Sequence, residues 1–505
     1  MQIDVQATAP LEFETPCLVV PLWQEEALSG LTAELNERLD GLIQSIITDD
    51  GFKGSNGETR VLYTQDKLKT SRVILLGQGK RDKLAPDKLR QAIAKAARGV
   101  RAIKRESFAL ALPALKGIKP EEAATAASEG IILGLYVFRD FKTPNEHETE
   151  VSHATLLTSS AGPVRRGVRY GQVAADATIR ARVLVNLPSN KKSPQFLAEQ
   201  AQQIADANGL RCEVWDEQRI QEERMGALWG VGMGSDNPPR FIILEYAPRG
   251  QEAEPAIALV GKGMTFDSGG YSLKPPQSME DMKDDMSGAA VVLGAMSALK
   301  DLKIPRRVLG IIPTAENMVN GHAQRPGDIV TARNGKTIEV LNTDAEGRLI
   351  LADALSYVVE QKPAAIIDFA TLTGAIGIAL GQEAAGLFTN DAGASTLFEN
   401  GGGFAQKIWQ AGERTGDRVW PFPTWDEYKE HVKGSVSDLK NIGIERRAGS
   451  IAGAVFLEQF VDAGIPWAHL DIAAVSFIRE DRPLTARGAT GFGVRLTLEL
   501  LRSWS

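Results

Sequence analysis

The pattern of apolar positions divides the first third of the chain into short buried strands and amphipathic helices. Continuous apolar runs at Arg72–Gly77 and Phe108–Pro113 predict buried strands. Asp87–Ile103 carries apolar residues at helical spacing, and a second helix is predicted from Pro120 to about Phe141. Val151–Thr158 returns to a strand pattern. Strands that alternate with helices are typical of an α/β domain with a largely parallel sheet.

A long pattern with few breakers, Val164–Asn186, predicts a helix that connects this domain to a second one. The second domain has strand candidates at Phe241–Tyr246, Ala256–Val260, Arg307–Ile312, Ala364–Phe369 and Trp467–Ile472. We therefore predict two α/β domains: a smaller one over residues 1–162, a connecting helix over 163–186, and a larger one over 187–505 with a central mixed sheet flanked by helices. The length of 505 residues agrees, since single cores stop growing near ~250–300 residues.

Composition excludes several classes of function. The formal net charge is −7, which argues against general affinity for nucleic acid or anionic membranes. The basic run Lys80–Arg105 is best explained as a solvated helix face. Cys17 and Cys212 lie far apart, which predicts no disulfide framework and excludes a Cys-rich zinc site. The first residues lack the pattern of a signal peptide, and no run of 18 apolar residues predicts a membrane span.

Candidate chemistry begins at the stretch Val260–Met286, VGKGMTFDSGGYSLKPPQSMEDMKDDM. Lys262 lies at the carboxyl end of a predicted strand, where open α/β sheets bind their ligands. The pattern of a phosphate-binding loop is absent there. Gly269 and Gly270 allow a tight turn or the close approach of a ligand, and Lys274 follows.

The same stretch continues into a predicted helix from Ser278 to Leu299 with a stripe of methionines on one face. On this helix Asp285 falls at the edge of the stripe nearest the interior, while Asp284 lies on the opposite face. A carboxylate turned toward a core needs a partner, because burying an unpaired charge is costly. A metal ion and a lysine both meet that need, so a purely structural salt bridge stays an alternative.

The second candidate stretch is Asn342–Leu349, NTDAEGRL, between the strand-like Thr337–Leu341 and a helix. Asp344 and Glu346 can face one site only if the loop runs through Glu346 before the helix begins. Ordinary helix capping is the alternative explanation of these acids. The pairing with the earlier acidic stretch favours a shared site.

Carboxylate-rich sites suit divalent ions such as Mg²⁺, Mn²⁺ and Zn²⁺. Four carboxylates are too many for one catalytic zinc and match a bridged pair of ions, as in two-metal hydrolases. Lys274 and Arg348 would then bind developing negative charge, and Lys262 could be a ligand only as the neutral amine. The residues alone predict metal-assisted hydrolysis and leave the substrate open.

The motifs VGKGMTFDSGGYSLKP, MKDDMSGAA and NTDAEGRLILADAL resemble the leucyl aminopeptidase family, the dinuclear-metal cytosol aminopeptidases. The resemblance continues through ENMVNGHAQRPGDIV, FATLTGA, SDLKNIG, RAGSIAGAVFL, WAHLDIA and ATGFGVR, from about Asn186 to the C-terminus. It implies that the larger domain is catalytic and that the N-terminal domain has an assembly or accessory role. The metal ligands that it implies for two Mn²⁺ or Zn²⁺ ions are Lys262, Asp267, Asp285, Asp344 and Glu346.

The resemblance also implies a mechanism and a substrate. Asp267 and Glu346 would bridge the ions, Lys274 would polarise the scissile carbonyl, and Arg348 would hold a bicarbonate that acts as general base. A bridging hydroxide would attack, and one ion would take the free α-amine of a peptide. The substrate-binding residues that the resemblance implies are Met282, Thr371, Leu372 and Gly374, which favour leucine and other apolar side chains. Family members are typically cytoplasmic homohexamers.

Several alternatives and departures accompany this prediction. Tyr271 and Ala474 differ from the residues common in the family, which affects the shape of the pocket more than the chemistry. An assembly that binds DNA or partner proteins is one alternative function, and a Mg²⁺-dependent phosphoryl-transfer enzyme is another. A serine hydrolase is disfavoured because the pattern GxSxG is absent. His469 lies in a strand-like segment and is predicted to be a satisfied core histidine.

Overall fold

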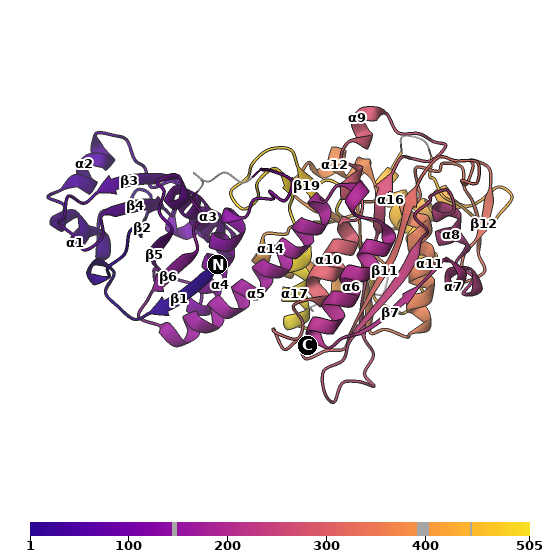
Figure 1. Ribbon diagram of the computed structural model, residues 1–505, viewed down its shortest axis with the longest axis horizontal. Coiled ribbons are helices and arrows are strands. Elements are labelled where there is room, and N and C mark those ends of the chain that lie inside the picture. The colour runs from indigo at the N-terminus through magenta and orange to yellow at the C-terminus, as the bar shows by residue number, and fades with distance from the viewer. Residues whose placement is uncertain (144–148, 391–402, 445–446, 505) are drawn as a thin grey trace. The chain divides into compact units, whose positions relative to one another are not determined.

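The computed structural model describes residues 1–143, 149–390, 403–444 and 447–504. The chain forms two compact units, each with its own sheet (Figure 1). The first unit contains Met1–Asp176 and Glu480–Arg487, and the second contains Ala177–Arg479 and Gly488–Ser505. The two units divide within the long helix α5 (Ala161–Asn186).

In the described part of the first unit, six strands form one sheet in the order β1-β6-β5-β2-β4-β3. Every neighbouring pair is parallel except β3 with β4. The strands are β1 (Gln2–Gln6), β2 (Leu18–Leu22), β3 (Thr59–Tyr63), β4 (Arg72–Gly77), β5 (Ser107–Ala111) and β6 (His153–Leu157). The helices are α1 (Leu31–Arg38), α2 (Leu42–Thr48), α3 (Pro86–Ala102) and α4 (Pro120–Leu135). The predicted α/β domain with a largely parallel sheet is confirmed.

The second unit is built on a sheet of nine described strands in the order β16-β15-β18-β14-β9-β11-β8-β7, with β10 beside β11. Strands β18, β14, β9 and β11 run parallel, while β8 and β15 run antiparallel to their neighbours β11 and β18. The strands are β7 (Arg211–Trp215), β8 (Arg240–Tyr246), β9 (Ile257–Gly261), β10 (Gly263–Asp267), β11 (Val308–Asn317), β14 (Ala365–Ala370), β15 (Ala385–Thr389), β16 (Val419–Pro421) and β18 (Trp467–Asp471). The sheet is mixed, as predicted.

Helices cover both faces of this sheet, with α6, α10 and α17 on one face and α8, α11 and α16 on the other (Figure 1). Every residue of β9, β11, β14 and β18 is buried, which explains their continuous apolar runs in the sequence. The helices are α6 (Pro194–Asn208), α7 (Glu217–Glu222), α8 (Gly226–Gly232), α9 (Pro276–Met279), α10 (Ser287–Met296), α11 (Gly347–Glu360), α12 (Gly374–Leu380), α14 (Phe404–Thr415), α15 (Asp426–Lys429), α16 (Gly449–Glu458) and α17 (Val494–Arg502).

Smaller elements complete the second unit. A three-stranded sheet in the order β12-β13-β17 and the pair β19-β20 lie outside the main sheet. Their bounds are β12 (Ile329–Thr331), β13 (Thr337–Glu339), β17 (Leu439–Lys440), β19 (Phe477–Ile478) and β20 (Gly488–Ala489). In the residues that the structure describes, no helix is both long and apolar enough to cross a membrane.

Two predicted helices differ from the structure. The helix predicted from Pro120 to about Phe141 ends at Leu135, because Tyr136 has an extended backbone. The helix predicted from Ser278 to Leu299 is wrong as a continuous element: α9 and the 3₁₀ turn η4 (Met282–Asp284) precede α10, which begins at Ser287. The methionine stripe therefore does not share one helical face, and Asp285 reaches its position from the turn before α10.

Candidate metal centre

The candidate site lies where the buried parallel strands of the second unit end. Strand β9 ends at Gly261 and is followed by Lys262, and β10 ends at Asp267. Asp285 immediately follows the turn η4, and Asp344 and Glu346 lie in the loop before α11. Loops at the carboxyl ends of such strands are where α/β sheets bind ligands. The fold thus brings both acidic stretches of the sequence to one edge.

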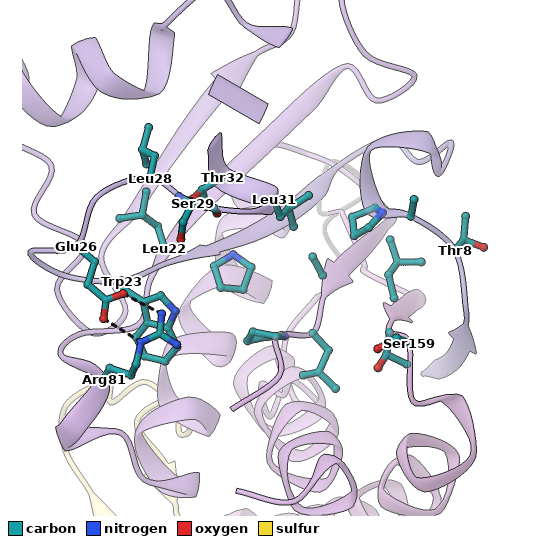
Figure 2. Close-up of a pocket in the computed structure, with 18 of the residues that line it drawn as sticks. Thr8, Leu22, Trp23, Glu26, Leu28, Ser29, Leu31, Thr32, Arg81 and Ser159 are labelled. Atoms are coloured by element: carbon teal, nitrogen blue, oxygen red, sulfur yellow. Dashed lines mark hydrogen bonds and ion pairs between the residues drawn. The ribbon is translucent and has the colours of Figure 1, made fainter. Parts of the chain in front are cut away.

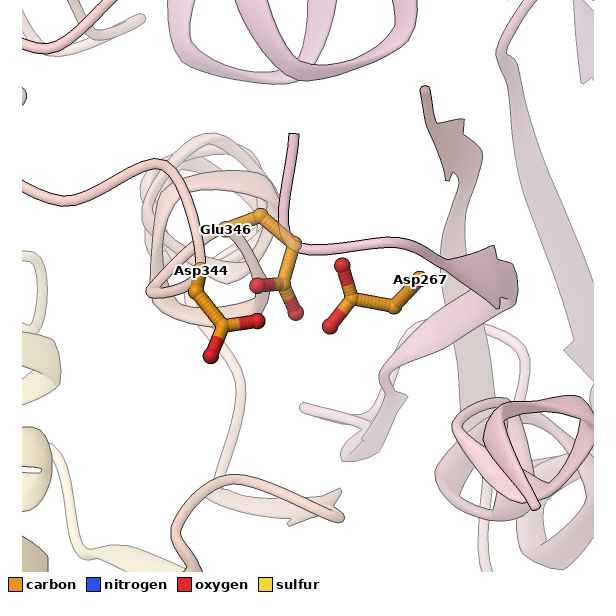
Figure 3. A group of neighbouring side chains, drawn as sticks. All are labelled: Asp267, Asp344 and Glu346. Atoms are coloured by element: carbon orange, nitrogen blue, oxygen red, sulfur yellow. The ribbon is translucent and has the colours of Figure 1, made fainter. Parts of the chain in front are cut away.

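Three carboxyl groups from the two stretches converge at this edge. One oxygen from each of Asp267, Asp344 and Glu346 lies within 4.8 Å of the others, a spacing that can hold a metal ion. Figure 3 shows the three carboxyl groups facing one another. Asp267 and Glu346 are buried and Asp344 is partly buried. Glu346 makes no capping hydrogen bond to α11, so helix capping does not explain it.

Lys262 joins the fourth carboxylate to this group. Its Nζ lies 2.8 Å from Oδ1 of Asp285 and 2.9 Å from Oε1 of Glu346, and it donates a 2.9 Å hydrogen bond to the carbonyl of Thr371. The hydroxyl of Thr371 donates a 2.6 Å hydrogen bond to Oδ1 of Asp285. Asp285 and Glu346 are therefore held on opposite sides of one buried ammonium group.

Lys274 plays the corresponding part for the other two acids. Its Nζ lies 2.8 Å from Oδ2 of Asp267 and 2.5 Å from Oδ1 of Asp344. The other oxygen of Asp267 accepts hydrogen bonds from the backbone N–H of Gly269 at 2.9 Å and from Nδ2 of Asn317 at 2.8 Å. Gly269 has a φ of +85°, which glycine adopts readily, and a Cβ at this position would lie 2.5 Å from the carbonyl oxygen of Ser272.

The pKa values of the site reflect a surplus of negative charge. Four carboxyl groups face two lysines, so full ionisation leaves two negative charges uncompensated. Burial, with the charge of Glu346, raises the pKa of Asp267 to about 6, and burial raises the pKa of Asp285 and Asp344. For Glu346 burial acts to raise the pKa, but the two lysines outweigh it and hold this pKa below its ordinary value. Bound cations would stabilise the ionised carboxylates.

The donor set fits divalent ions. Oδ2 of Asp285 and Oε2 of Glu346 are buried and have no hydrogen-bond partner within the described part of the chain. Buried carboxylate oxygens without partners are costly, and a metal ion satisfies them. Burial alone would lower the pKa of Lys262, but the surrounding carboxylates raise it above its ordinary value. Lys262 is therefore an ammonium in this arrangement, and it would have to lose a proton to act as the metal ligand that the sequence predicts.

Arg348 follows Glu346 closely and lies in the first turn of α11. Burial lowers the pKa of this arginine to about 10, although the charges of Glu346 and Asp471 oppose the shift. Its Nε is buried and lacks a hydrogen-bond partner among the described residues. A buried cation with an unused donor is a suitable partner for a small oxyanion.

The predicted substrate residues lie on the loops around this site. Thr371 and Leu372 follow β14, and Thr371 contacts both Lys262 and Asp285. Gly374 begins α12 and is exposed, and Met282 begins η4 and is partly buried. The roles of these four residues in substrate binding stay predictions.

Sequence reasoning missed the residues that hold the acidic loops. Asn317, buried at the end of β11, donates to Asp267 and, at 2.9 Å, to the carbonyl of Thr343. Asn441 accepts a 2.9 Å hydrogen bond from the N–H of Leu341 and donates at 2.6 Å to the carbonyl of Asn342. Both lie in the motifs ENMVNG and SDLKNIG, so the motifs pointed to the right segments without revealing what these side chains do.

Asp471 at the end of β18 holds the loop that follows β14. Its carboxylate accepts hydrogen bonds from the N–H of Leu372 at 3.2 Å, the N–H of Thr373 at 3.4 Å and the hydroxyl of Thr373 at 2.6 Å. On the same strand, Nδ1 of His469 pairs with Oδ1 of Asp368 at 2.5 Å, and both side chains are fully buried. His469 is thus a core histidine, as predicted, but it is only half satisfied, because its buried Nε2 has no hydrogen-bond partner among the described residues.

A separate cavity of about 490 Å³ lies in the first unit, at the carboxyl ends of β1, β2, β5 and β6 (Figure 2). Its lining is mostly apolar and has two charged residues, Glu26 and Arg81, which form hydrogen bonds of 2.9 and 2.8 Å with each other. The Arg81 guanidinium lies 4.3 Å from the centre of the Trp23 ring. This cavity offers no group of carboxylates, so the hydrolytic chemistry belongs to the second unit.

Comparison with known proteins identifies the family. The sequence model for the catalytic domain of the cytosol aminopeptidase family matches residues 179–498, and the model for its N-terminal domain matches residues 19–145. The chain belongs to the cytosol aminopeptidase family. This confirms the resemblance seen in the sequence and extends it to the N-terminal domain, where the motifs gave little signal.

Individual relatives of this cytosol aminopeptidase family cover the whole chain. A probable cytosol aminopeptidase from Roseiflexus castenholzii is 42% identical over 100% of both chains, and one from Geotalea uraniireducens is 43% identical over 98% of each. Among solved structures, a variant of tomato leucine aminopeptidase has a TM-score of 0.88 at 34% identity, covering 99% of this chain and 96% of that chain. The bottromycin maturation enzyme BotP in complex with Mn has a TM-score of 0.84 at 34% identity, covering 97% and 99%.

Proposed function

We propose that this protein is a metal-dependent aminopeptidase that releases N-terminal residues from peptides, with leucine and other apolar residues preferred. Family membership supports the reaction class. The observation that carries the proposal is the convergence of Asp267, Asp344 and Glu346, together with one buried oxygen each of Asp285 and Glu346 that has no hydrogen-bond partner among the residues the structure describes. Such a surplus of carboxylate donors suits two divalent ions better than one.

Five residues would hold the two ions: Asp267 and Glu346 between them, Asp344 on one, and Lys262 and Asp285 on the other. When bound, a pair of divalent ions lowers the pKa of a coordinated water toward ~7 and thereby supplies a nucleophile at neutral pH. Carboxylate and amine ligands are compatible with Mn²⁺ and Zn²⁺. The structural relative BotP was solved in complex with Mn, which favours Mn²⁺ as the first ion to test.

Lys274 would act on the substrate. In the metal-free arrangement its ammonium lies between Asp267 and Asp344. Burial alone would lower its pKa, but the acids, Asp267 first, raise this pKa above its ordinary value, so the group stays charged at neutral pH. This ammonium would donate a hydrogen bond to the scissile carbonyl oxygen and stabilise the oxyanion that develops there.

Arg348 would hold a bicarbonate that accepts a proton during the reaction. The support is its buried guanidinium, whose Nε has no hydrogen-bond partner in the described structure, one turn from the acidic loop. Removing this arginine should therefore lower the rate more than it lowers metal binding.

The substrate would lie along the loop that follows β14. The loop 371–373 is fixed by Asp471 and by Lys262, which gives its backbone a defined position for pairing with a peptide. Met282, Leu372 and Gly374 would border the first side-chain pocket. A methionine beside small residues adapts to aliphatic side chains, which supports the preference for leucine.

Assembly and location follow the family. We expect a homohexamer, and we expect it in the cytoplasm, because relatives from Roseiflexus castenholzii and Geotalea uraniireducens are named cytosol aminopeptidases. Analytical ultracentrifugation should give about six times the 54.5 kDa mass of one chain.

The deciding experiment removes and restores the metal. The protein is stripped with a chelator, reconstituted with Mn²⁺ or Zn²⁺, and assayed with a leucyl anilide and with its N-acetylated form. We expect hydrolysis of the free-amine substrate alone and only after reconstitution. Equal cleavage of the acetylated substrate would contradict an exopeptidase. Phosphate release from nucleotides, with indifference to anilides, would instead favour the phosphoryl-transfer alternative.

A further inference from the structure

Lys192 is a fully buried lysine that does not belong to the acidic cluster. It follows the 3₁₀ turn η3 (Ser189–Lys191), just after the end of α5. Its Nζ donates hydrogen bonds to the carbonyls of Leu184 at 2.9 Å, Val185 at 3.3 Å and Lys283 at 2.7 Å. The three donors of the ammonium group are thus matched by three backbone acceptors from two distant segments.

Two of these acceptors are at the C-terminus of α5. The last carbonyls of a helix have no partner within the helix and carry the negative end of its dipole, so a lysine there is favourable. A lysine that only capped the helix could keep its charge in water. Lys192 is instead buried completely, and this burial lowers its pKa to about 7, although Asp284 offsets part of the shift. Its buried position adds a third hydrogen bond, to the carbonyl of Lys283, which helix capping does not require.

The third acceptor belongs to the turn that places Asp285. Lys283 lies in η4, two residues before Asp285. Its carbonyl accepts the hydrogen bond from Nζ of Lys192. The hydroxyl of Ser287 donates a 2.6 Å hydrogen bond to the carbonyl of Asp284, which fixes the turn from the other side. Only the four-residue helix α9 precedes this short turn, and α10 does not begin until Ser287. Its position therefore depends on these individual hydrogen bonds.

The segment before Lys192 contacts the other acidic strand. The hydroxyl of Ser189 donates a 2.8 Å hydrogen bond to the carbonyl of Thr265, two residues before Asp267 on β10. Residues 189–192 therefore connect the end of α5 to both segments of the first acidic stretch. A connection of this kind fixes the separation between Asp267 and Asp285.

We propose that Lys192 is a positioning residue for the metal centre, which sets the place of Asp285 by holding the carbonyl of Lys283 against the end of α5. The inference rests on the proposed function, because that function makes Asp285 a ligand of one of the two ions. Lys192 touches neither substrate nor metal ligand. Its effect passes through the backbone, and residues that orient metal ligands in this way typically change metal affinity by about 10- to 100-fold when they are replaced.

The test compares Lys192→Met with Lys191→Met in the full chain. Lys191 is the exposed neighbour of Lys192. The two variants therefore make the same chemical change, one at the buried lysine that binds the three carbonyls and one outside this group of hydrogen bonds. Mn²⁺ is titrated into each metal-stripped protein by calorimetry. We expect wild type and Lys191→Met to bind two equivalents alike. Lys192→Met should bind one equivalent normally and the other about 10- to 100-fold more weakly. At saturating Mn²⁺ its kcat should recover, with KM for the leucyl anilide little changed.

A purely structural role gives a different result. If Lys192 only caps α5, Lys192→Met lowers the unfolding temperature of the metal-free protein but leaves both Mn²⁺ affinities at the wild-type values, which overturns the inference. If Lys192→Met does not fold, Ser189→Ala decides, because it removes only the partly buried hydrogen bond to the carbonyl of Thr265. A weaker second Mn²⁺ equivalent in Ser189→Ala supports the connection, and unchanged affinities overturn it. Failure of wild type to bind Mn²⁺ contradicts the proposed function itself.

Discussion

Replacing Gly347 by alanine separates the stability of the fold from the geometry of the metal centre. Gly347 is the first residue of α11, directly after Glu346. A Cβ at this position would lie 2.5 Å from Cε and 2.6 Å from Nζ of Lys262. Because ordinary contact begins near 3.4 Å, the end of Lys262 has to move by about 1 Å. Lys262 is buried, so little free space surrounds it.

The size of the effect follows from the hydrogen bonds of Lys262. Its Nζ lies 2.8–2.9 Å from Asp285, Glu346 and the carbonyl of Thr371, so a shift of about 1 Å breaks at least one contact. Displacing the Lys262 amine, a predicted metal ligand, should weaken metal binding by about 10- to 100-fold, the range typical when the groups around a metal site are disturbed. The lost hydrogen bond to a charged group separately costs the metal-free protein roughly 1.5–3 kcal/mol of stability. The new alanine favours the helix by up to about 1 kcal/mol, which offsets part of this cost and keeps the net loss of fold stability modest.

The assay combines calorimetric titration of Mn²⁺ with thermal unfolding of the metal-free protein. We expect Gly347→Ala to bind one of the two ions, the one that Lys262 and Asp285 would hold, about 10- to 100-fold more weakly. Its unfolding temperature should fall only modestly. The control is Gly99→Ala in α3, where the added Cβ would make an ordinary contact of 3.5 Å with Ile74. Wild-type Mn²⁺ affinity in Gly347→Ala would refute the position assigned to Lys262.

Further predictions concern the same site and the cysteines. Asp344→Asn should lose one Mn²⁺ equivalent and most of the rate together, measured by metal analysis and anilide hydrolysis. Lys274→Ala should keep both equivalents and lose about 10²- to 10³-fold in kcat, since it removes one oxyanion donor; an unchanged kcat would exclude that role. Asn441→Ala should weaken Mn²⁺ binding by about tenfold, because it frees the acidic loop. Burial raises the pKa of Cys17 to about 12 and of Cys212 to about 11, so both stay neutral thiols at pH 8. Iodoacetamide should therefore label them only after unfolding, and the free energy of unfolding should fall as the pH rises above about 8.5, where the unfolded thiols ionise first.

The sequence predicted the elements whose burial leaves a clear pattern. Strands β9, β11, β14 and β18 are buried along their whole length, so each appears as a continuous apolar run. Strand β7 was missed because it lies at the edge of the sheet and three of its five residues, including Arg211 and Glu213, are exposed. Strand β10 was not predicted, because the sequence pattern places Lys262 at the end of a strand, whereas the chain resumes beside β11 directly after this residue.

The candidate acids could be predicted, but the way in which they are held could not. Asp344 and Glu346 meet Asp267 as expected, and α11 begins after Glu346, as their common orientation required. Asp285 was placed by a helical pattern that the chain does not follow, because the Asp-rich turn η4 interrupts it. Asn317 is a polar residue on a buried strand. Its sequence position does not reveal that its side chain donates a hydrogen bond to a loop 26 residues away.

The central claim is that acids from two distant stretches bind a pair of cations. The most direct measurement is anomalous X-ray scattering from crystals of the full chain soaked in Mn²⁺. We expect two peaks per chain, both beside Asp267 and Glu346. One peak should also lie beside Asp344, and the other beside Asp285 and Lys262. A single peak, or peaks away from these residues in a protein that hydrolyses leucyl anilide, would contradict it.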